Sequence, residues 1–275
     1  MLLPRIITAI VGIPLVILAI FWGGIPLFVL MAGVTFLALR EYFAIAQFAR
    51  YDLYPWAGTI AGIFLFVSVF LNNTYLAALD ASQGTSLIVT LMIAFLFIIE
   101  LLRKNPEKAI ERLGITFFGA FFIPWTLAHI LLIRNIPTAG SGYLYFLFIS
   151  IWILDTGAYA FGVRFGKRPL ASSVSPKKTL EGALGGIVTG ILSALILRFF
   201  FLRAEITVPE SVFIGLFIAV VAQFSDLAES ILKRDAGVKD SAALLPGHGG
   251  MLDRFDSLLF AAPLFYYYLT IFKAG

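Results

Sequence analysis

Residues 86–102 of the chain read SLIVTLMIAFLFIIELL, and this stretch decides the fold class. Its one ionisable side chain is Glu100, and a segment that crosses a bilayer needs roughly 20 mostly apolar residues. The rest of the chain has the same character, because 60% of its 275 residues are hydrophobic and only 13% are charged. Soluble domains carry about 25% charged residues. The composition therefore excludes a soluble globular protein and predicts an all-α protein that crosses a membrane many times.

Apolar runs separated by turn residues predict a polytopic bundle of about nine transmembrane helices. The predicted spans are residues 6–21, 25–39, 54–71, 86–102, 114–133, 143–161, 183–201, 212–224 and 258–272. The first two are the least clearly separated, since Gly23-Gly24-Ile25-Pro26 suits either a hairpin turn or a kink in one longer helix. The first run resembles a secretory signal peptide, but no small-x-small cleavage pattern follows it, so we expect a retained span.

Basic residues predict how these spans are oriented. With a cytoplasmic amino terminus, all but four of the 20 Lys and Arg residues fall on the cytoplasmic side. The positive-inside rule then places the carboxyl terminus outside. The expected location is the cytoplasmic, or inner, membrane. Nucleic acid is not an expected partner, because the basic residues lie between apolar runs instead of on a soluble face. The chain has no cysteine, which excludes disulfides, thiolate metal sites and a cysteine nucleophile.

Polar residues divide the chain into two regions. Residues 1–110 are predicted to be amino-terminal membrane spans, and residues 111–275 a catalytic membrane domain with two polar cytoplasmic segments, 162–182 and 226–256. The second of these segments carries ten charged residues. Any chemistry is therefore expected at the cytoplasmic face.

An acidic residue interrupts the sixth predicted span. Asp155 lies in an otherwise apolar run, where a charge costs at least about 2.5 kcal/mol, so it must face protein or water. Tyr159 and Gly162 follow at i+4 and i+7 and share its helical face. The pattern favours a substrate contact near the cytoplasmic end, and the alternative is a structural hydrogen bond between helices.

A polar stripe is predicted on the helix that leaves the eighth span. Asp226, Glu229, Ser230 and Lys233 fall at i, i+3, i+4 and i+7, with Arg234 slightly to the side. Such a stripe cannot face lipid. It indicates either a functional site or a solvated face held by internal salt bridges.

A glycine-rich turn precedes the last span. Glycines let backbone amides approach a ligand closely, and amides at a helix start favour phosphate oxygens. Asp253 and Asp256, at i and i+3 on the following helix, are oxygen ligands of the kind that magnesium prefers. The alternative is helix capping by Asp253 with Asp256 in the first turn.

The first polar segment offers hydroxyl and ammonium groups beside the membrane. Ser175, Lys177, Lys178 and Thr179 lie there, and lysine binds phosphate as a point charge with hydroxyls adding donors. The alternative is a basic cluster that only attracts anionic lipid or sets topology. His129, inside the fifth span, has no polar neighbour at helical spacing and is interpreted as structural.

Carboxylates, basic residues and a glycine turn on one membrane face are what phosphoryl or nucleotidyl transfer needs. An enzyme is therefore favoured over the alternative, a polytopic transporter or flippase for an anionic phospholipid. Transporters also use intramembrane charges, but here the charges gather at the cytoplasmic ends of the spans instead of spreading across the bilayer.

The same residues carry a family resemblance. Residues 230–256 contain S-x-x-K-R-x4-K-D followed by P-G-H-G-G-x-x-D-R-x-D, which resembles the complete signature of the phosphatidate cytidylyltransferases, or CDP-diacylglycerol synthases. The patterns D-x-x-A-Y at residues 155–159 and S-P-K-K-T-x-E-G at residues 175–182 are similar to further segments of that family. The resemblance covers the carboxyl-terminal half, while the first 110 residues match only as generic spans.

This resemblance implies the reaction of CTP with phosphatidic acid to give CDP-diacylglycerol and pyrophosphate, in a homodimeric membrane enzyme of phospholipid biosynthesis. It implies Mg2+ held by Asp226, Asp253 and Asp256, and a second, monovalent cation, K+. It further implies that the CTP phosphates are surrounded by Lys233, Arg234, Lys239 and His248. The other residues expected to bind substrate are Asp155, Tyr159, Ser175, Lys177, Lys178, Thr179, Glu181, Glu229, Ser230, Gly249, Gly250 and Arg254.

Overall fold

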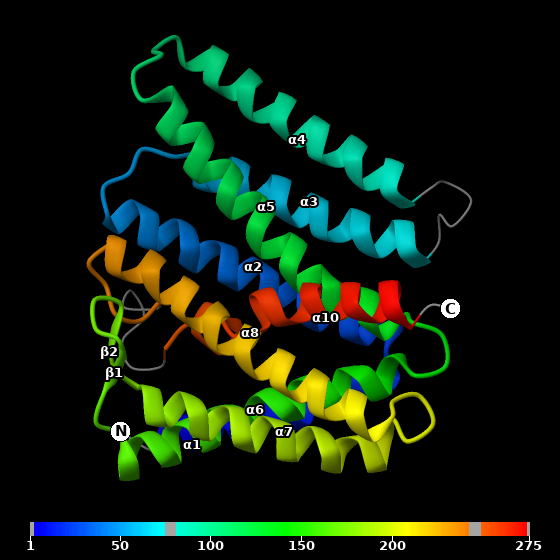
Figure 1. Ribbon diagram of the computed structural model, residues 1–275. Helices are drawn as coiled ribbons and strands as arrows, with labels where there is room; N and C mark the ends of the chain where they lie inside the picture. The colour runs from blue at the N-terminus through cyan, green and yellow to red at the C-terminus, as the bar shows by residue number, and fades with distance from the viewer. Residues whose placement is uncertain (1–2, 75–80, 242–248, 274–275) are drawn as a thin grey trace. The chain divides into compact units, whose positions relative to one another are not determined.

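The computed structural model describes residues 3–74, 81–241 and 249–273, and most of them are helical (Figure 1). The elements in chain order are α1 Leu3–Trp22, α2 Gly24–Phe48, α3 Pro55–Thr74, α4 Ala81–Arg103, α5 Ala109–Arg134, α6 Gly140–Phe165, β1 Pro169–Ala171, β2 Ser175–Thr179, α7 Leu180–Phe201, α8 Val208–Asp235, α9 Leu252–Phe255 and α10 Leu258–Phe272. The all-α class is confirmed. One small addition is a two-stranded antiparallel sheet, β1 with β2, where sequence reasoning expected a loop.

Eight stretches within the described residues are helical, long and apolar enough to cross a membrane. A shorter apolar helix, Ile10–Trp22, precedes them, so the predicted count of about nine is close. The largest difference in bounds concerns the eighth predicted span, 212–224, because α8 runs from Val208 to Asp235. The span and the polar stripe thus form one continuous helix, in which i,i+4 pairs support the turns beyond the apolar part.

The glycine pair after α1 separates two helices and does not kink one. Gly23 and Gly24 have φ values of 63° and 46°, a conformation that glycine adopts at no steric cost and that ends a right-handed helix. The Arg134 guanidinium packs against Gly23, where a Cβ would lie 2.7 Å from Arg134 Cζ. Its Nε donates a hydrogen bond to the carbonyl of Ile20 at 2.9 Å. The turn between α1 and α2 therefore also binds Arg134 at the end of α5.

The chain divides into two compact units. The first unit contains Met1–Asn135 and Asp235–Arg254, and the second contains Ile136–Arg234 and Phe255–Gly275. This boundary differs from the one predicted at residue 110. The predicted boundary concerned where catalytic residues lie, which compactness does not test, so it stays a prediction.

The first unit packs α2, α3, α4 and α5 against one another. Ala61, Met92 and Ala120 lie at the centre of one of its apolar clusters. Small residues allow close approach there, because a Cβ on Gly62 would lie 3.0 Å from the carbonyl oxygen of Ala120. His129 is buried in α5, and its Nδ1 lies 2.7 Å from the carbonyl oxygen of Trp125, which suits the predicted structural role.

A buried arginine ties the loops at one end of the first unit together. Arg112 is 1% exposed, and it donates to Asp52 at 2.6 Å and to Glu100 at 3.0 Å. Arg103 also pairs with Asp52. Burial tends to raise the pKa of Asp52, but hydrogen bonds from Arg112 and Arg103 outweigh it and hold that pKa below its usual value.

The second unit packs α6 against α7 through glycines. A Cβ on Gly182 would lie 2.8 Å from the carbonyl oxygen of Ala158, and one on Gly157 would overlap the hydroxyl of Thr189. Bare backbone at these positions lets the two helices come close enough to present residues of both to a shared space. The hairpin β1–β2 joins them at one end and contacts α7.

Candidate active site

A cavity of about 630 Å³ lies in the second unit, lined by α6, the hairpin, α7 and α8. The predicted site residues that line it are Asp155, Tyr159, Ser175, Lys177, Lys178, Thr179 and Asp226. Three separate sequence patterns thus converge on one space. Gly162 and Gly182 lie in its wall and provide the bare backbone that the sequence suggested for this face.

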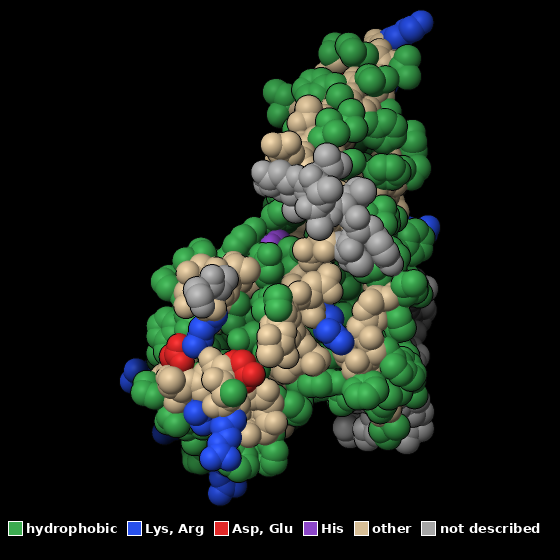
Figure 2. Space-filling model, turned by 90° about the vertical axis from the view of Figure 1, so that its right-hand side faces the viewer, with side chains coloured by type: hydrophobic (Ala, Val, Ile, Leu, Met, Phe, Trp, Pro, Cys, Tyr) green, Lys and Arg blue, Asp and Glu red, His purple; other side chains and the backbone are tan. Residues whose placement is uncertain are grey.

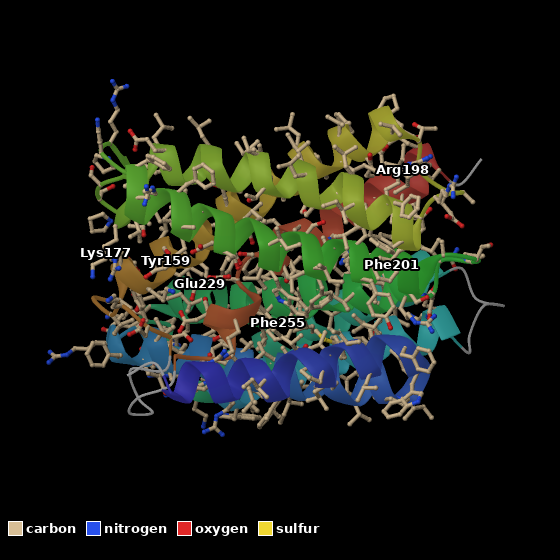
Figure 3. The ribbon with its side chains drawn as sticks, turned by 90° about the horizontal axis from the view of Figure 1, so that it is seen from below. Tyr159, Lys177, Arg198, Phe201, Glu229 and Phe255 are labelled. Atoms are coloured by element: carbon tan, nitrogen blue, oxygen red, sulfur yellow. The ribbon has the colours of Figure 1, made fainter. Side chains whose placement is uncertain are left out.

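The cavity lies toward the end of the second unit that contains the hairpin and Lys177. Figure 3 shows Tyr159, Lys177 and Glu229 toward one end of the helices, with Arg198 and Phe201 toward the other. Figure 2 shows one face of the molecule, on which hydrophobic side chains lie over much of the surface and a few Lys, Arg, Asp and Glu side chains gather in one place. A recess with charged and apolar lining at one end of apolar helices suits an amphiphilic ligand whose charged part lies at the aqueous side of a membrane.

Lysine and aspartate form an ion pair across the cavity. Lys178 Nζ of β2 contacts the Asp226 carboxylate of α8, and both side chains are partly exposed. Asp155 interacts electrostatically with the same two groups. A lysine held among carboxylates beside an open space is placed to meet an incoming phosphate.

Several carboxylates interact with Asp256. Asp256, which follows α9, interacts electrostatically with Asp226, Glu229 and Asp155. The fold thereby brings together acidic residues that are up to about 100 positions apart in the chain, on three elements. Such a concentration of like charge in a partly buried region is unfavourable unless cations compensate it.

The polar stripe of α8 is present, but part of it is buried inside the unit. Lys233 and Glu229 form an i,i+4 ion pair whose side chains are 9% and 0% exposed, and Ser230 is also buried. Arg234 Nε donates to the carbonyl of Val174 in the hairpin at 2.9 Å. Glu229 and Lys233 therefore form the internal salt bridge that was the alternative interpretation of the stripe. Glu229 also interacts electrostatically with Asp256.

The glycine turn belongs to the first unit, and three of the amides that the structure describes there are paired. Gly250 N donates to Asp253 Oδ2 at 2.8 Å, and the amides of Met251 and Leu252 donate to Glu41. These three amides are therefore paired in this structure, and the phosphate-binding role predicted for the helix start stays a prediction. Substrate binding by Gly249 stays a prediction, and His248, which was expected near the CTP phosphates, lies outside the described residues.

Three other predicted residues do not line the cavity. Lys239 and Arg254 are exposed residues of the first unit. Glu181 accepts hydrogen bonds from the amides of Lys167 and Arg168 at 2.9 and 3.2 Å, so it holds the chain that enters the hairpin. Its role is structural in the contacts that the structure shows.

Two residues with site contacts were missed from the sequence. Gln223 lines the cavity one turn before Asp226, and its amide donates to the carbonyls of Ala183 and Ala219. A polar side chain inside an apolar span could have indicated it. Glu41 was missed because its partners in the glycine turn lie more than 200 residues away in the chain.

The carboxylates could form part of a metal centre. Among residues 3–74, 81–241 and 249–273, no group of three or more His, Asp or Glu side chains is placed to hold a metal ion by itself. Magnesium needs one or two carboxylates, with water and substrate phosphates completing its shell. Asp226 and Asp256, which interact within the second unit, fit that smaller requirement. Asp253 lies in the first unit, and its place in a shared centre stays a prediction.

The helices and the charged cavity define a multi-pass membrane protein with a polar site among its spanning segments. Comparison with known proteins identifies the family. The model of the cytidylyltransferase family matches residues 3–272, and the chain belongs to that family.

Similar proteins cover the chain almost completely. It is 32% identical to the phosphatidate cytidylyltransferase of Bacillus subtilis and 33% identical to that of Haemophilus influenzae, each over 98% of both chains. It is 34% identical to the phosphatidate cytidylyltransferase of Synechocystis over 97% of this chain and 96% of the relative. The similarity therefore includes the first 110 residues, which sequence reasoning treated as generic spans.

Proposed function

We propose that this protein condenses CTP with phosphatidic acid to give CDP-diacylglycerol and pyrophosphate. The observation that carries the proposal is the cavity between α6, the hairpin, α7 and α8, where lysines and carboxylates meet inside a membrane protein of the cytidylyltransferase family. Near-full-length relatives named phosphatidate cytidylyltransferase support the choice of both substrates.

The chemistry follows from the charges of the substrates. A phosphatidate oxygen, which is already anionic, attacks the α-phosphorus of CTP. A new oxygen–phosphorus bond forms there while the bond to the β-phosphate oxygen breaks, and pyrophosphate leaves. No strong general base is required, because the nucleophile carries no proton that must be removed. The difficulty is repulsion between two polyanions, and preorganised cations lower that barrier.

Lysines of the hairpin are suited to this task. Lys178 is held at the cavity by Asp226, and Lys177 lines the same space. When a phosphate enters, it competes with Asp226 for the Lys178 ammonium group. The lysine would then neutralise substrate charge, while the Asp226 carboxylate would become available to a metal ion.

We propose magnesium as the cofactor, held by Asp226 and Asp256 with Asp253 as a third candidate. Bound there, the ion would compensate charge on the phosphates of CTP and pyrophosphate. The electrostatic interactions of Asp256 with Asp226, Glu229 and Asp155 support this choice, because acidic groups so placed favour a divalent cation. A monovalent potassium ion, implied by the family resemblance, is part of the same proposal and is testable by omitting it from the assay.

We also propose the setting of the enzyme. The distribution of Lys and Arg supports a cytoplasmic amino terminus and an outer carboxyl terminus in the inner membrane. The cavity would then face the compartment that contains CTP, while the acyl chains of phosphatidate stay among the spans. A homodimer is proposed on the family resemblance and is testable by the mass of the protein in detergent.

The decisive experiment uses purified full-length protein in mixed micelles. Pyrophosphate release from CTP should require both phosphatidic acid and magnesium, and CDP-diacylglycerol should appear in equal amount. The matched variant Asp226→Asn should fold and lose this activity. The transporter alternative predicts phospholipid movement across vesicles with no pyrophosphate release, and that result would overturn the proposal.

A further inference from the structure

The glycine turn before α9 is bound by a carboxylate from the amino-terminal half of the chain. Glu41 lies near the end of α2. Its Oε1 accepts from the amide of Met251 at 2.7 Å, and its Oε2 accepts from the amide of Leu252 at 2.8 Å. Both oxygens are thus used on successive residues of the turn. Glu41 and the turn belong to the same compact unit.

A second carboxylate and a serine complete the arrangement. Ser241 Oγ lies 2.9 Å from Glu41 Oε2 and 2.9 Å from Asp253 Oδ2. Asp253 Oδ2 also accepts from the amides of Ser241 at 2.9 Å and Gly250 at 2.8 Å. Both carboxylates therefore lie within hydrogen-bond distance of the Ser241 hydroxyl, and together they accept from three successive amides of the turn and from the amide of Ser241.

The fit around Gly250 leaves no room for a side chain. A Cβ at this position would overlap both Ser241 Oγ and Glu41 Oε2. Glycine is required here because of this close approach, although its φ is not among the positive values. Ser241 is 1% exposed. Charge-assisted hydrogen bonds in such a buried place fix backbone position more strongly than neutral ones.

We infer that Glu41 is a positioning residue for the reaction. It sets the backbone of residues 250–252, and through Ser241 it sets the carboxylate of Asp253, which is a proposed site residue. This inference rests on the proposed function, because the turn is expected to meet CTP. It assigns a role in nucleotide binding to α2, in the part of the chain that carries no recognised signature.

The chemistry of the side chain explains why only a carboxylate serves. The Met251 and Leu252 amides are both donors, and so is the Ser241 hydroxyl. A glutamine at position 41 has one acceptor oxygen, and its NH2 group would face a second donor. Glu41→Gln therefore keeps the volume of the side chain but breaks at least one of the two bonds to the turn.

The test is steady-state pyrophosphate release by the full chain in mixed micelles, with CTP and phosphatidic acid varied in turn. Glu41→Gln should lower kcat/KM for CTP by about 100-fold, the scale expected for a misplacement of about 1 Å in an active site. The KM for CTP should rise by about tenfold. The KM for phosphatidic acid should stay within about twofold of its wild-type value.

Two controls separate positioning from folding. Glu100→Gln removes a carboxylate that pairs with buried Arg112 in the same unit and does not contact the turn. It should lower thermal stability and the amount of active enzyme while leaving both KM values unchanged. Glu107→Gln, at an exposed loop position, should change neither stability nor kinetics.

A second variant keeps the inference testable if Glu41→Gln does not fold. Ser241→Ala removes the hydroxyl between the two carboxylates and should raise the KM for CTP in the same direction by a smaller factor. If the folded Glu41 variant, or in its place Ser241→Ala, changes kcat alone or matches Glu100→Gln, then Glu41 only stabilises the fold and the inference is wrong. If wild-type protein releases no pyrophosphate from CTP, the proposed function itself has failed.

Discussion

Replacement of Lys233 by methionine tests how the polar stripe of α8 works. Lys233 forms its ion pair with Glu229 almost entirely away from solvent, with side chains 9% and 0% exposed. Methionine keeps most of the apolar volume of lysine and removes its charge. Glu229 would then remain buried, close to the acidic group of Asp256, without its lysine.

The magnitude follows from that burial. Removing one partner of a buried ion pair costs about 3 to 5 kcal/mol, because the remaining charge is desolvated without compensation. For a protein of this size, that loss corresponds to an apparent Tm lower by about 10 °C. The exposed pair between Lys108 and Glu111, at 4.0 Å, provides the control. Lys108→Met should cost no more than about 1 kcal/mol.

The assay combines thermal unfolding in detergent with pyrophosphate release. Lys233→Met should be strongly destabilised and inactive. The double variant Lys233→Met with Glu229→Gln should recover most of the stability, because a neutral buried pair carries no uncompensated charge. It should stay inactive if Lys233 also serves the CTP phosphates.

Two results would refute parts of this reasoning. A Lys233→Met variant that is as stable as Lys108→Met would mean that the buried pair contributes nothing. A double variant with wild-type activity would remove Lys233 from the phosphate site and leave it with a structural role only.

Three further predictions concern other parts of the molecule. Asp253→Asn should reduce turnover by at least about 100-fold in folded protein. The substitution removes the charge of a carboxylate oxygen that accepts three hydrogen bonds. Near-wild-type turnover would exclude Asp253 from the proposed active site. The pKa of Asp52 is lower in the folded protein than its ordinary value of about 3.9, so its ionised form adds stability above that value, and this stability is lost as the pH falls through the folded pKa. Asp52→Asn should therefore make the free energy of unfolding depend less on pH in the acid range. An unchanged dependence would contradict this prediction. Thr138 precedes the 26-residue helix α6 and Ser173 follows it. Single cysteines at these two positions should react with an impermeant thiol reagent from opposite faces of oriented vesicles, and the one at Ser173 should react from the cytoplasmic face. Labelling of both from one face would overturn the proposed topology.

Periodicity and composition were sufficient for the fold class and for much of the cavity. Long apolar runs must be helical in a bilayer, because lipid offers no partner for unpaired backbone groups. Asp155 and Tyr159 were placed on one face by a spacing of four residues, and the structure puts both in the cavity wall. The same rule put Glu229 and Lys233 on one face, with internal salt bridges as one of two alternatives, and the structure shows the ion pair. These are local relations within one helix.

The hairpin was not predicted from the sequence. Residues 169–179 contain proline, lysine and serine, which are typical of a loop, and the strands are short. Pairing of Pro169 with Thr179 and of Ala171 with Ser175 depends on two segments meeting, which composition does not specify. This pairing places Lys178 opposite Asp226.

By itself, the sequence determined what is set by neighbours along the chain: the transmembrane helices, the polar character of their ends and the residue types suited to phosphate chemistry. Only the tertiary structure decided which partner each charge took. It assigned the amides of Met251 and Leu252 to Glu41, Lys178 to Asp226, and Lys233 to the buried interior instead of open solvent. The physical reason is that a buried polar group must be paired, and its partner is whichever group packing brings within about 3 Å, at any distance along the chain.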